Sequence, residues 1–139
     1  MRIVVDTNQL VRALMRPPEL GTFIMAWQAQ RFTVVCSPQL LDEYRRVLDY
    51  PEVAELVRSE LRRLFFSQLM QEMEMVELPD IPQICRDPED DKVIATAVFG
   101  AVDYLATGDA DIRTKTITAQ LQAAGIFLIT IDELLVLLG

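Results

Sequence analysis

Apolar and polar positions follow two patterns along this chain: short runs of apolar residues, and longer stretches with apolar residues three or four positions apart. The short runs predict strands and the longer stretches predict helices. The expected strands are 2–6, 32–36, 104–106 and 127–129, with a further short strand at 75–78. The expected helices are about 8–15, 21–30, 38–50, 52–73 (one helix or a pair), 87–99, 115–124 and a last one after 130.

Residues that start and stop helices separate these elements. Ser37-Pro38 supplies an N-cap followed by a proline at the first helical position, and Thr130–Glu133 is a capping box. Arg16-Pro17-Pro18 is expected to break the first helical pattern, and Gly100 to end the helix before it. Because strands alternate with helices, we predict a single three-layer α/β domain over residues 1–139, with a mostly parallel central sheet flanked by helices.

Four carboxylates fall where a strand should end or a helix should begin: Asp6, Glu43, Asp91 and Asp109. In open α/β sheets, sites form outside the carboxyl ends of the strands, where the strand order reverses. Each acid has an ordinary explanation of its own, as a helix cap, a solvated surface charge or a turn residue. Their shared position at one predicted edge favours a common site, where several carboxylates would need a cation as counter-charge.

Composition narrows the chemistry of such a site. The chain has a formal charge of −8 and a pI near 4.5, which argues against nucleic-acid binding over the whole surface. It has no histidine, which excludes Ser-His-Asp and Cys-His catalysis and zinc sites of the Cys/His type. Two isolated cysteines, Cys36 and Cys85, predict buried free thiols. The absence of a signal peptide or a long apolar run leads us to expect a cytoplasmic protein with no membrane segment.

With these kinds of site excluded, carboxylates that bind Mg²⁺ or Mn²⁺ are the remaining kind of catalytic site. These hard ions prefer oxygen ligands and commonly combine carboxylates with substrate phosphate. The chemistry they favour is phosphoester hydrolysis, in which the metal polarises the phosphate and lowers the pKa of the attacking water.

Four segments of the chain together resemble the PIN-domain ribonuclease family, in particular the VapC-like toxins of toxin–antitoxin pairs. They are Val4–Asn8, Ser37–Glu43, Arg86–Ala97 and Asp103–Asp111, and their order and spacing fit from end to end. The resemblance implies a compact sheet flanked by helices, an acidic pocket with one or two Mg²⁺ or Mn²⁺ ions, and endonucleolytic cleavage of RNA. It also implies a cognate antitoxin and a homodimer as partners.

By the same resemblance, the catalytic and metal-binding acids are Asp6, Glu43, Asp91 and Asp109. Asp6 and Asp91 are the strongest candidates for direct ligands, and Asp111 replaces or assists Asp109. Asn8 and Thr107 are expected to orient water or carboxylates from behind the ligands. Cations near the acidic motifs are candidates for contacts with RNA phosphates; these are Arg12, Arg16, Arg45, Arg46, Lys92, Arg113 and Lys115.

Three further interpretations stay open. The apolar stripe of Leu64, Phe65, Phe66, Leu69, Met70 and Met73 is either core or a partner surface. A non-catalytic PIN-like module that binds RNA or protein is the alternative to an enzyme, although a binding module has no need for four converging acids. An aspartyl-nucleophile phosphatase is disfavoured, because its second acid would fall at position 8, which is Asn8.

Overall fold

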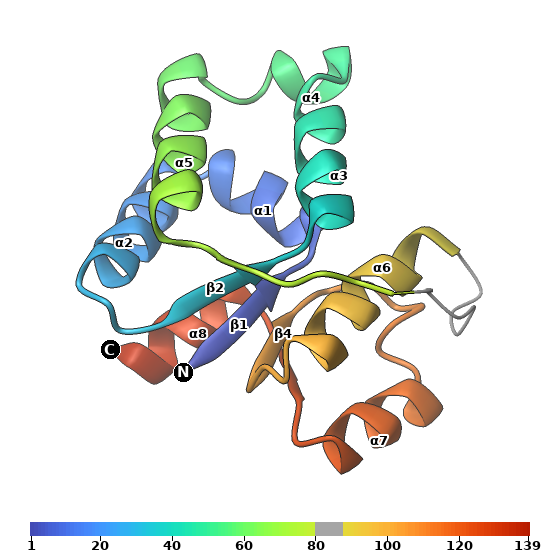
Figure 1. Ribbon diagram of the computed structural model, residues 1–139. Coiled ribbons are helices and arrows are strands. Elements are labelled where there is room, and N and C mark those ends of the chain that lie inside the picture. Colours follow the sequence, from blue (N-terminus) through green and yellow to red (C-terminus); the bar gives the residue numbers. More distant parts are fainter. Residues whose placement is uncertain (80–87) are drawn as a thin grey trace.

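A central parallel sheet organises the molecule (Figure 1). The computed structural model describes residues 1–79 and 88–139, without the side chains of residues 88 and 89. Within this part of the chain, five strands pair in the order β3-β2-β1-β4-β5, and every pairing is parallel. The strands are β1 Arg2–Val5, β2 Thr33–Cys36, β3 Glu74–Met75, β4 Tyr104–Ala106 and β5 Phe127–Ile129. The expected α/β class is confirmed, and the sheet is wholly parallel.

Helices connect the strands and cover the sheet. They are α1 Thr7–Leu14, α2 Pro17–Gln28, α3 Pro38–Leu48, α4 Pro51–Ala54, α5 Ser59–Glu72, α6 Pro88–Phe99, α7 Lys115–Ala123 and α8 Ile131–Leu138. In Figure 1, α1, α2, α3 and α5 gather in the upper part of the view, and α6 and α7 lie at its lower right. Helix α6 packs against β1, β2 and β4, and α7 packs against β5.

The predicted helix starts are largely confirmed. The Ser37 hydroxyl accepts a hydrogen bond of 3.2 Å from the backbone N–H of Leu40 at the start of α3. Thr130 and Glu133 form both bonds of the capping box that opens α8. These side chains satisfy backbone donors that a helix cannot pair internally, so each fixes where its helix begins.

Two boundaries differ from the sequence prediction. Helix α2 begins at Pro17 and not at residue 21, because a proline in the first turn of a helix needs no partner for an N–H group. Of the two alternatives for 52–73, one helix or a pair, the structure has the pair α4 and α5. Strand β3 lies at Glu74–Met75, earlier than the expected 75–78. The predicted helix start at Asp87 lies outside the described residues.

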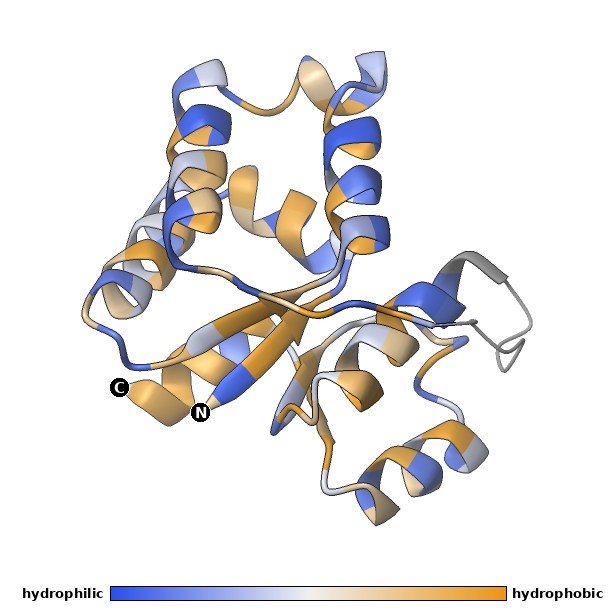
Figure 2. Ribbon diagram, in the orientation of Figure 1, coloured by the Kyte–Doolittle hydropathy of each residue, from blue (hydrophilic) through white to orange (hydrophobic). Residues whose placement is uncertain are grey.

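The buried apolar residues of β1 and β2 belong to the core, and Figure 2 colours much of both strands orange, for hydrophobic. An aromatic cluster joins α2 to α5, with Trp27 and Phe65 ring centroids 6.2 Å apart. The apolar stripe on α5 is therefore divided: Phe65 and Leu69 are buried core residues, whereas Leu64 and Met70 are exposed.

Cys36 is a buried free thiol, as expected, and burial raises its pKa to about 12. Cys85 lies outside the described residues. In the part of the chain that the structure describes, no helix combines the length and apolar character that a membrane span requires.

The strand order reverses at β1, and this reversal determines where on the sheet a site is expected. The chain leaves β1 for β2 on one side and later returns to β4 on the other. Val5 pairs in register with Ala106, so the next residues, Asp6 and Thr107, follow neighbouring strands at the same carboxyl edge. This is the place where open α/β sheets form their binding sites.

Candidate active site

Asp6 lies directly after β1 and is 4% exposed. Its backbone N–H donates to the carbonyl of Ala106 at 2.8 Å, which extends the ladder between β1 and β4 by one bond. Asp6 occupies the N-cap position of α1 but makes no side-chain capping hydrogen bond. Its carboxylate instead accepts a 2.7 Å hydrogen bond from the Thr107 hydroxyl. The carboxylate is therefore held at the sheet edge by the neighbouring strand and does not act as a helix cap.

The surroundings of Asp6 disfavour its charge. Burial is the largest cause and raises the pKa of Asp6 from 3.8 to about 6, and the negative charges of Asp109 and Glu43 act in the same direction. The hydrogen bond from Thr107 opposes this rise but does not cancel it. Two other predicted site acids, Glu43 and Asp109, thus lie close enough to Asp6 to raise its pKa.

The loop after β4 is tied together by hydrogen bonds around Thr107. The Thr107 hydroxyl, which donates to Asp6, accepts from the backbone N–H of Asp109 at 3.1 Å. The Asp109 carboxylate accepts from the N–H of Asp111 at 2.8 Å, and Arg113 Nε donates to the Thr107 carbonyl at 2.8 Å. The positions of Asp6 and Asp109 are therefore coupled through a single threonine side chain, in line with the orienting role predicted for Thr107.

Glu43 approaches the same edge from α3 and is buried. One carboxylate oxygen, Oε2, accepts a hydrogen bond from the Thr7 hydroxyl, and the other, Oε1, lies 3.5 Å from Lys92 Nζ. The next residue, Tyr44, donates its hydroxyl hydrogen bond to the carbonyl of Val5, the last residue of β1. Helix α3 is therefore anchored to the strand that ends in Asp6.

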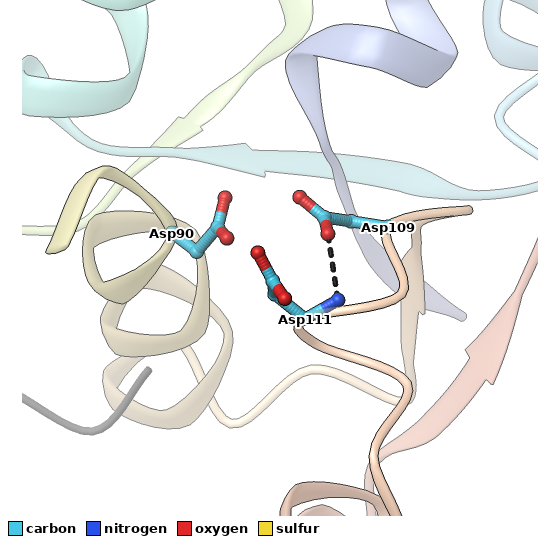
Figure 3. Close-up of side chains that lie close together, drawn as sticks. All are labelled: Asp90, Asp109 and Asp111. Atoms are coloured by element: carbon cyan, nitrogen blue, oxygen red, sulfur yellow. Dashed lines mark hydrogen bonds between the residues drawn. The ribbon is translucent and has the colours of Figure 1, made fainter. Parts of the chain in front are cut away.

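Helix α6 contributes adjacent acids in its first turn. One carboxylate oxygen each from Asp90, Asp109 and Asp111 lies within 4.8 Å of the others, and all three residues are partly buried (Figure 3). Of the four predicted ligands, Asp109 belongs to this group, whereas Asp6, Glu43 and Asp91 do not. Asp91 is 3% exposed and lies beside Asp90 in sequence. Direct ligation by Asp6, Glu43 and Asp91 stays a prediction.

Asp90 is not among the site residues that the sequence predicts. The only available signal was its place beside Asp91, because the sequence does not determine which of two consecutive helical residues faces a neighbouring loop. Asp111, expected to replace or assist Asp109, lies close to it (Figure 3).

A groove runs along α1, the helix that follows Asp6. It has a volume of about 450 Å³ and is lined by Asn8, Val11, Arg12, Met15 and Arg16. Asn8 is exposed, and no hydrogen bond links it to the acids among the described residues. Arg16 pairs with Glu19 at 2.9 Å, whereas Arg12 makes no ion pair within the described part of the chain. The orienting role predicted for Asn8 stays a prediction.

Comparison with known proteins agrees with this arrangement. A family model described as PIN domain matches residues 2–111. The chain belongs to the PIN domain family. Searches of curated proteins and of solved structures returned no match. PIN domains are generally nucleases, so this PIN domain is assigned to hydrolases that act on nucleic acid.

The donor groups fit a divalent cation of the hard class. They are carboxylate oxygens from α6 and from the ends of β1 and β4, and the three clustered in Figure 3 can approach one ion together. The raised pKa of Asp6 shows the cost of holding a buried carboxylate near Asp109 and Glu43 without a counter-charge, with burial as the largest cause. A bound divalent ion would remove that cost.

Proposed function

We propose that this PIN domain is a divalent-metal-dependent endoribonuclease that hydrolyses RNA phosphodiester bonds. The observation that carries the proposal is the meeting of Asp6 and Asp109 after neighbouring strands, where the charge of Asp109 helps to raise the pKa of the buried Asp6. The proposed metal-binding and catalytic acids are Asp6, Asp91 and Asp109, assisted by Asp90 and Asp111, with Glu43 beside them. A non-catalytic module would gain nothing from burying a carboxylate against other carboxylates.

Mg²⁺ or Mn²⁺ at these acids would polarise the scissile phosphate and lower the pKa of the attacking water. The chain's own groups prepare the site for that chemistry. Thr107 holds one oxygen of Asp6 and the backbone of Asp109, which fixes the separation of the two carboxylates. Arg113 holds the carbonyl of Thr107 from behind. Such supporting hydrogen bonds orient metal ligands, and the bond from Thr107 favours the charged form of Asp6.

Substrate binding would use the groove along α1. Arg12 lies on the exposed side of α1, one turn after Asn8, and offers a guanidinium to a phosphate of the RNA strand. Val11 and Met15 supply apolar surface in the same groove for a base or ribose. A local cation beside the acids reconciles RNA binding with the overall charge of −8.

The test is cleavage of a labelled single-stranded RNA by the purified protein with Mn²⁺, and again with EDTA. The proposal predicts internal cleavage only with the metal, and a loss of about 10³-fold or more in Asp6→Asn and Asp109→Asn. Asp42→Asn, an exposed acid next to Glu43, is the matched control and should cleave normally. Cleavage that persists in EDTA or in both site variants would refute the assignment.

We further propose that the protein is the toxin of a toxin–antitoxin pair. Support comes from the likeness of its motifs to VapC-like toxins and from the apolar and cationic groove along α1, which suits an inhibitory peptide as well as RNA. Induced expression should arrest growth, Asp109→Asn should abolish the arrest, and co-expression of a small neighbouring gene should relieve it. Normal growth with active enzyme would remove the toxin assignment while leaving the nuclease intact.

A homodimer is the remaining part of the proposal. The exposed apolar side chains Val136 and Leu137 line a groove of about 550 Å³ between β5 and α8. An exposed apolar face of this kind favours an interface. Light scattering should give twice the mass of 15.8 kDa, and Val136→Glu should reduce it to that of one chain. A monomeric wild-type protein would exclude the dimer.

A further inference from the structure

Lys92 is a cation that lies beside one of the predicted site acids, Glu43. Lys92 and Glu43 approach to 3.5 Å, and their side chains are only 15% and 11% exposed. Ion pairs on a protein surface are weak because water screens them, but a pair this far from solvent is screened much less. The ammonium group is therefore a fixed part of the site's charge.

The position of Lys92 is set by the contact between two helices. The Thr96 hydroxyl donates to the carbonyl of Lys92 at 2.6 Å, and it lies 2.8 Å from the hydroxyl of Ser37. Ser37 caps α3, the helix that carries Glu43. The Thr96 hydroxyl in α6 thus ties this helix to the start of α3, which brings the lysine and the glutamate together before any ligand binds.

Both oxygens of Glu43 are already engaged. Oε1 faces Lys92, and Oε2 accepts from Thr7. In two-metal sites, the ions lie about 3.5–4 Å apart and bridging or flanking carboxylates offset their repulsion. A second ion at Glu43 would have to approach the ammonium of Lys92, which repels it and competes for the same carboxylate.

We infer that Lys92 acts as the resident counter-ion of Glu43 and restricts the site to a single divalent ion, held on the side of Asp6 and Asp109. The inference rests on the proposed metal-dependent function and adds to it the number of ions and the role of a lysine. Lys92 is a positioning residue, because it acts through Glu43 and not on the substrate.

Titration of the purified protein with Mn²⁺ tests the number of bound ions directly. Binding is followed by calorimetry and by the electron paramagnetic resonance signal of unbound Mn²⁺. The wild-type chain should bind one ion, and Lys92→Met should bind a second one. Lys92→Arg, which retains the charge, should return to one ion. Lys115→Met removes the same charge from an exposed site and should also bind one. Wild-type binding of two ions, or a Lys92→Met isotherm identical to that of the wild type, would overturn the inference.

A second variant covers the case in which Lys92→Met does not fold. Glu43→Gln should keep the dissociation constant of the first ion within about threefold of wild type, whereas Asp109→Asn should raise it at least about tenfold. A loss of affinity for the first ion in Glu43→Gln as large as that in Asp109→Asn would contradict the inference. Failure of the wild type to bind Mn²⁺ at all would overturn the proposed function as well, so the two failures are distinguishable.

Discussion

Replacing Asp6 by Asn should stabilise the metal-free protein while abolishing its activity. Asp6 is buried against Glu43 and Asp109, and its pKa is about 6 in the folded protein compared with 3.8 as the ordinary value. At about 1.4 kcal/mol for each pH unit, that difference corresponds to about 3 kcal/mol of unfavourable free energy in the folded state. Asn removes the charge and still offers an oxygen to the Thr107 hydroxyl.

The sign of the pH dependence follows from the raised pKa. Between pH 3.8 and about 6 the folded protein binds more protons at Asp6 than the unfolded chain does, so stability falls as the pH rises through this window. The increase in unfolding free energy in Asp6→Asn should therefore be complete above pH 6 and absent below pH 3.8. The molecular cause is burial, which penalises the carboxylate only when it is charged.

Urea denaturation in EDTA, carried out above and below this window, measures the effect. We expect Asp6→Asn to exceed the wild type by about 3 kcal/mol in unfolding free energy near neutral pH, and by less than about 0.5 kcal/mol near pH 3.5. The exposed control Asp42→Asn should change stability by less than about 0.5 kcal/mol at either pH. Mn²⁺ should stabilise the wild type and not Asp6→Asn. An Asn variant no more stable than wild type near neutral pH would refute the reasoning.

Three other predictions follow from separate contacts. Thr107→Val removes the hydroxyl between Asp6 and the Asp109 loop and should lower both Mn²⁺ affinity and cleavage by about 10–100-fold in titration and rate assays. Arg12→Gln should raise KM several-fold and make the salt dependence of RNA binding shallower by about one phosphate contact, measured over a salt series. Gly100→Ala places a methyl 2.8 Å from the carbonyl oxygen of Thr96 and should lower the urea midpoint, at a cost of about 1–3 kcal/mol.

Controls separate these effects from general damage. Thr107→Ser keeps the hydroxyl and should restore most of the activity, and an equal loss in Ser and Val would contradict the positioning role. Arg63→Gln alters an exposed arginine and should leave KM and the salt dependence unchanged. A Gly100→Ala midpoint equal to that of wild type would show that the helix end of α6 relaxes without cost.

The elements that carry the site were predictable because their signals are local. Apolar runs mark β1 and β4, and the residue after each run is fixed by the chain itself, so Asp6 and Thr107 could be assigned to one edge from the rule on strand order. The cap at Ser37 and the capping box at Thr130 were predictable for the same reason, since a cap depends on residues within one turn.

The rest depended on side-chain direction and on packing between distant elements. Asp90 and Asp91 differ by about 100° around α6, and only the contact of that helix with β1, β2 and β4 decides which faces the loop after β4. The pairing of Lys92 with Glu43 crosses two helices that the sequence separates widely. Helix α2 began earlier than expected because a proline pair is compatible both with the end of one helix and with the start of the next.

The most direct test of the central claim is a crystal structure with Mn²⁺, using anomalous scattering to locate the ion. The account predicts a single anomalous peak at the carboxyl edge of β1 and β4, about 2.0–2.2 Å from carboxylate oxygens of both Asp6 and Asp109. A peak that contacts neither residue, or no peak at this edge in a crystal saturated with Mn²⁺, would contradict it.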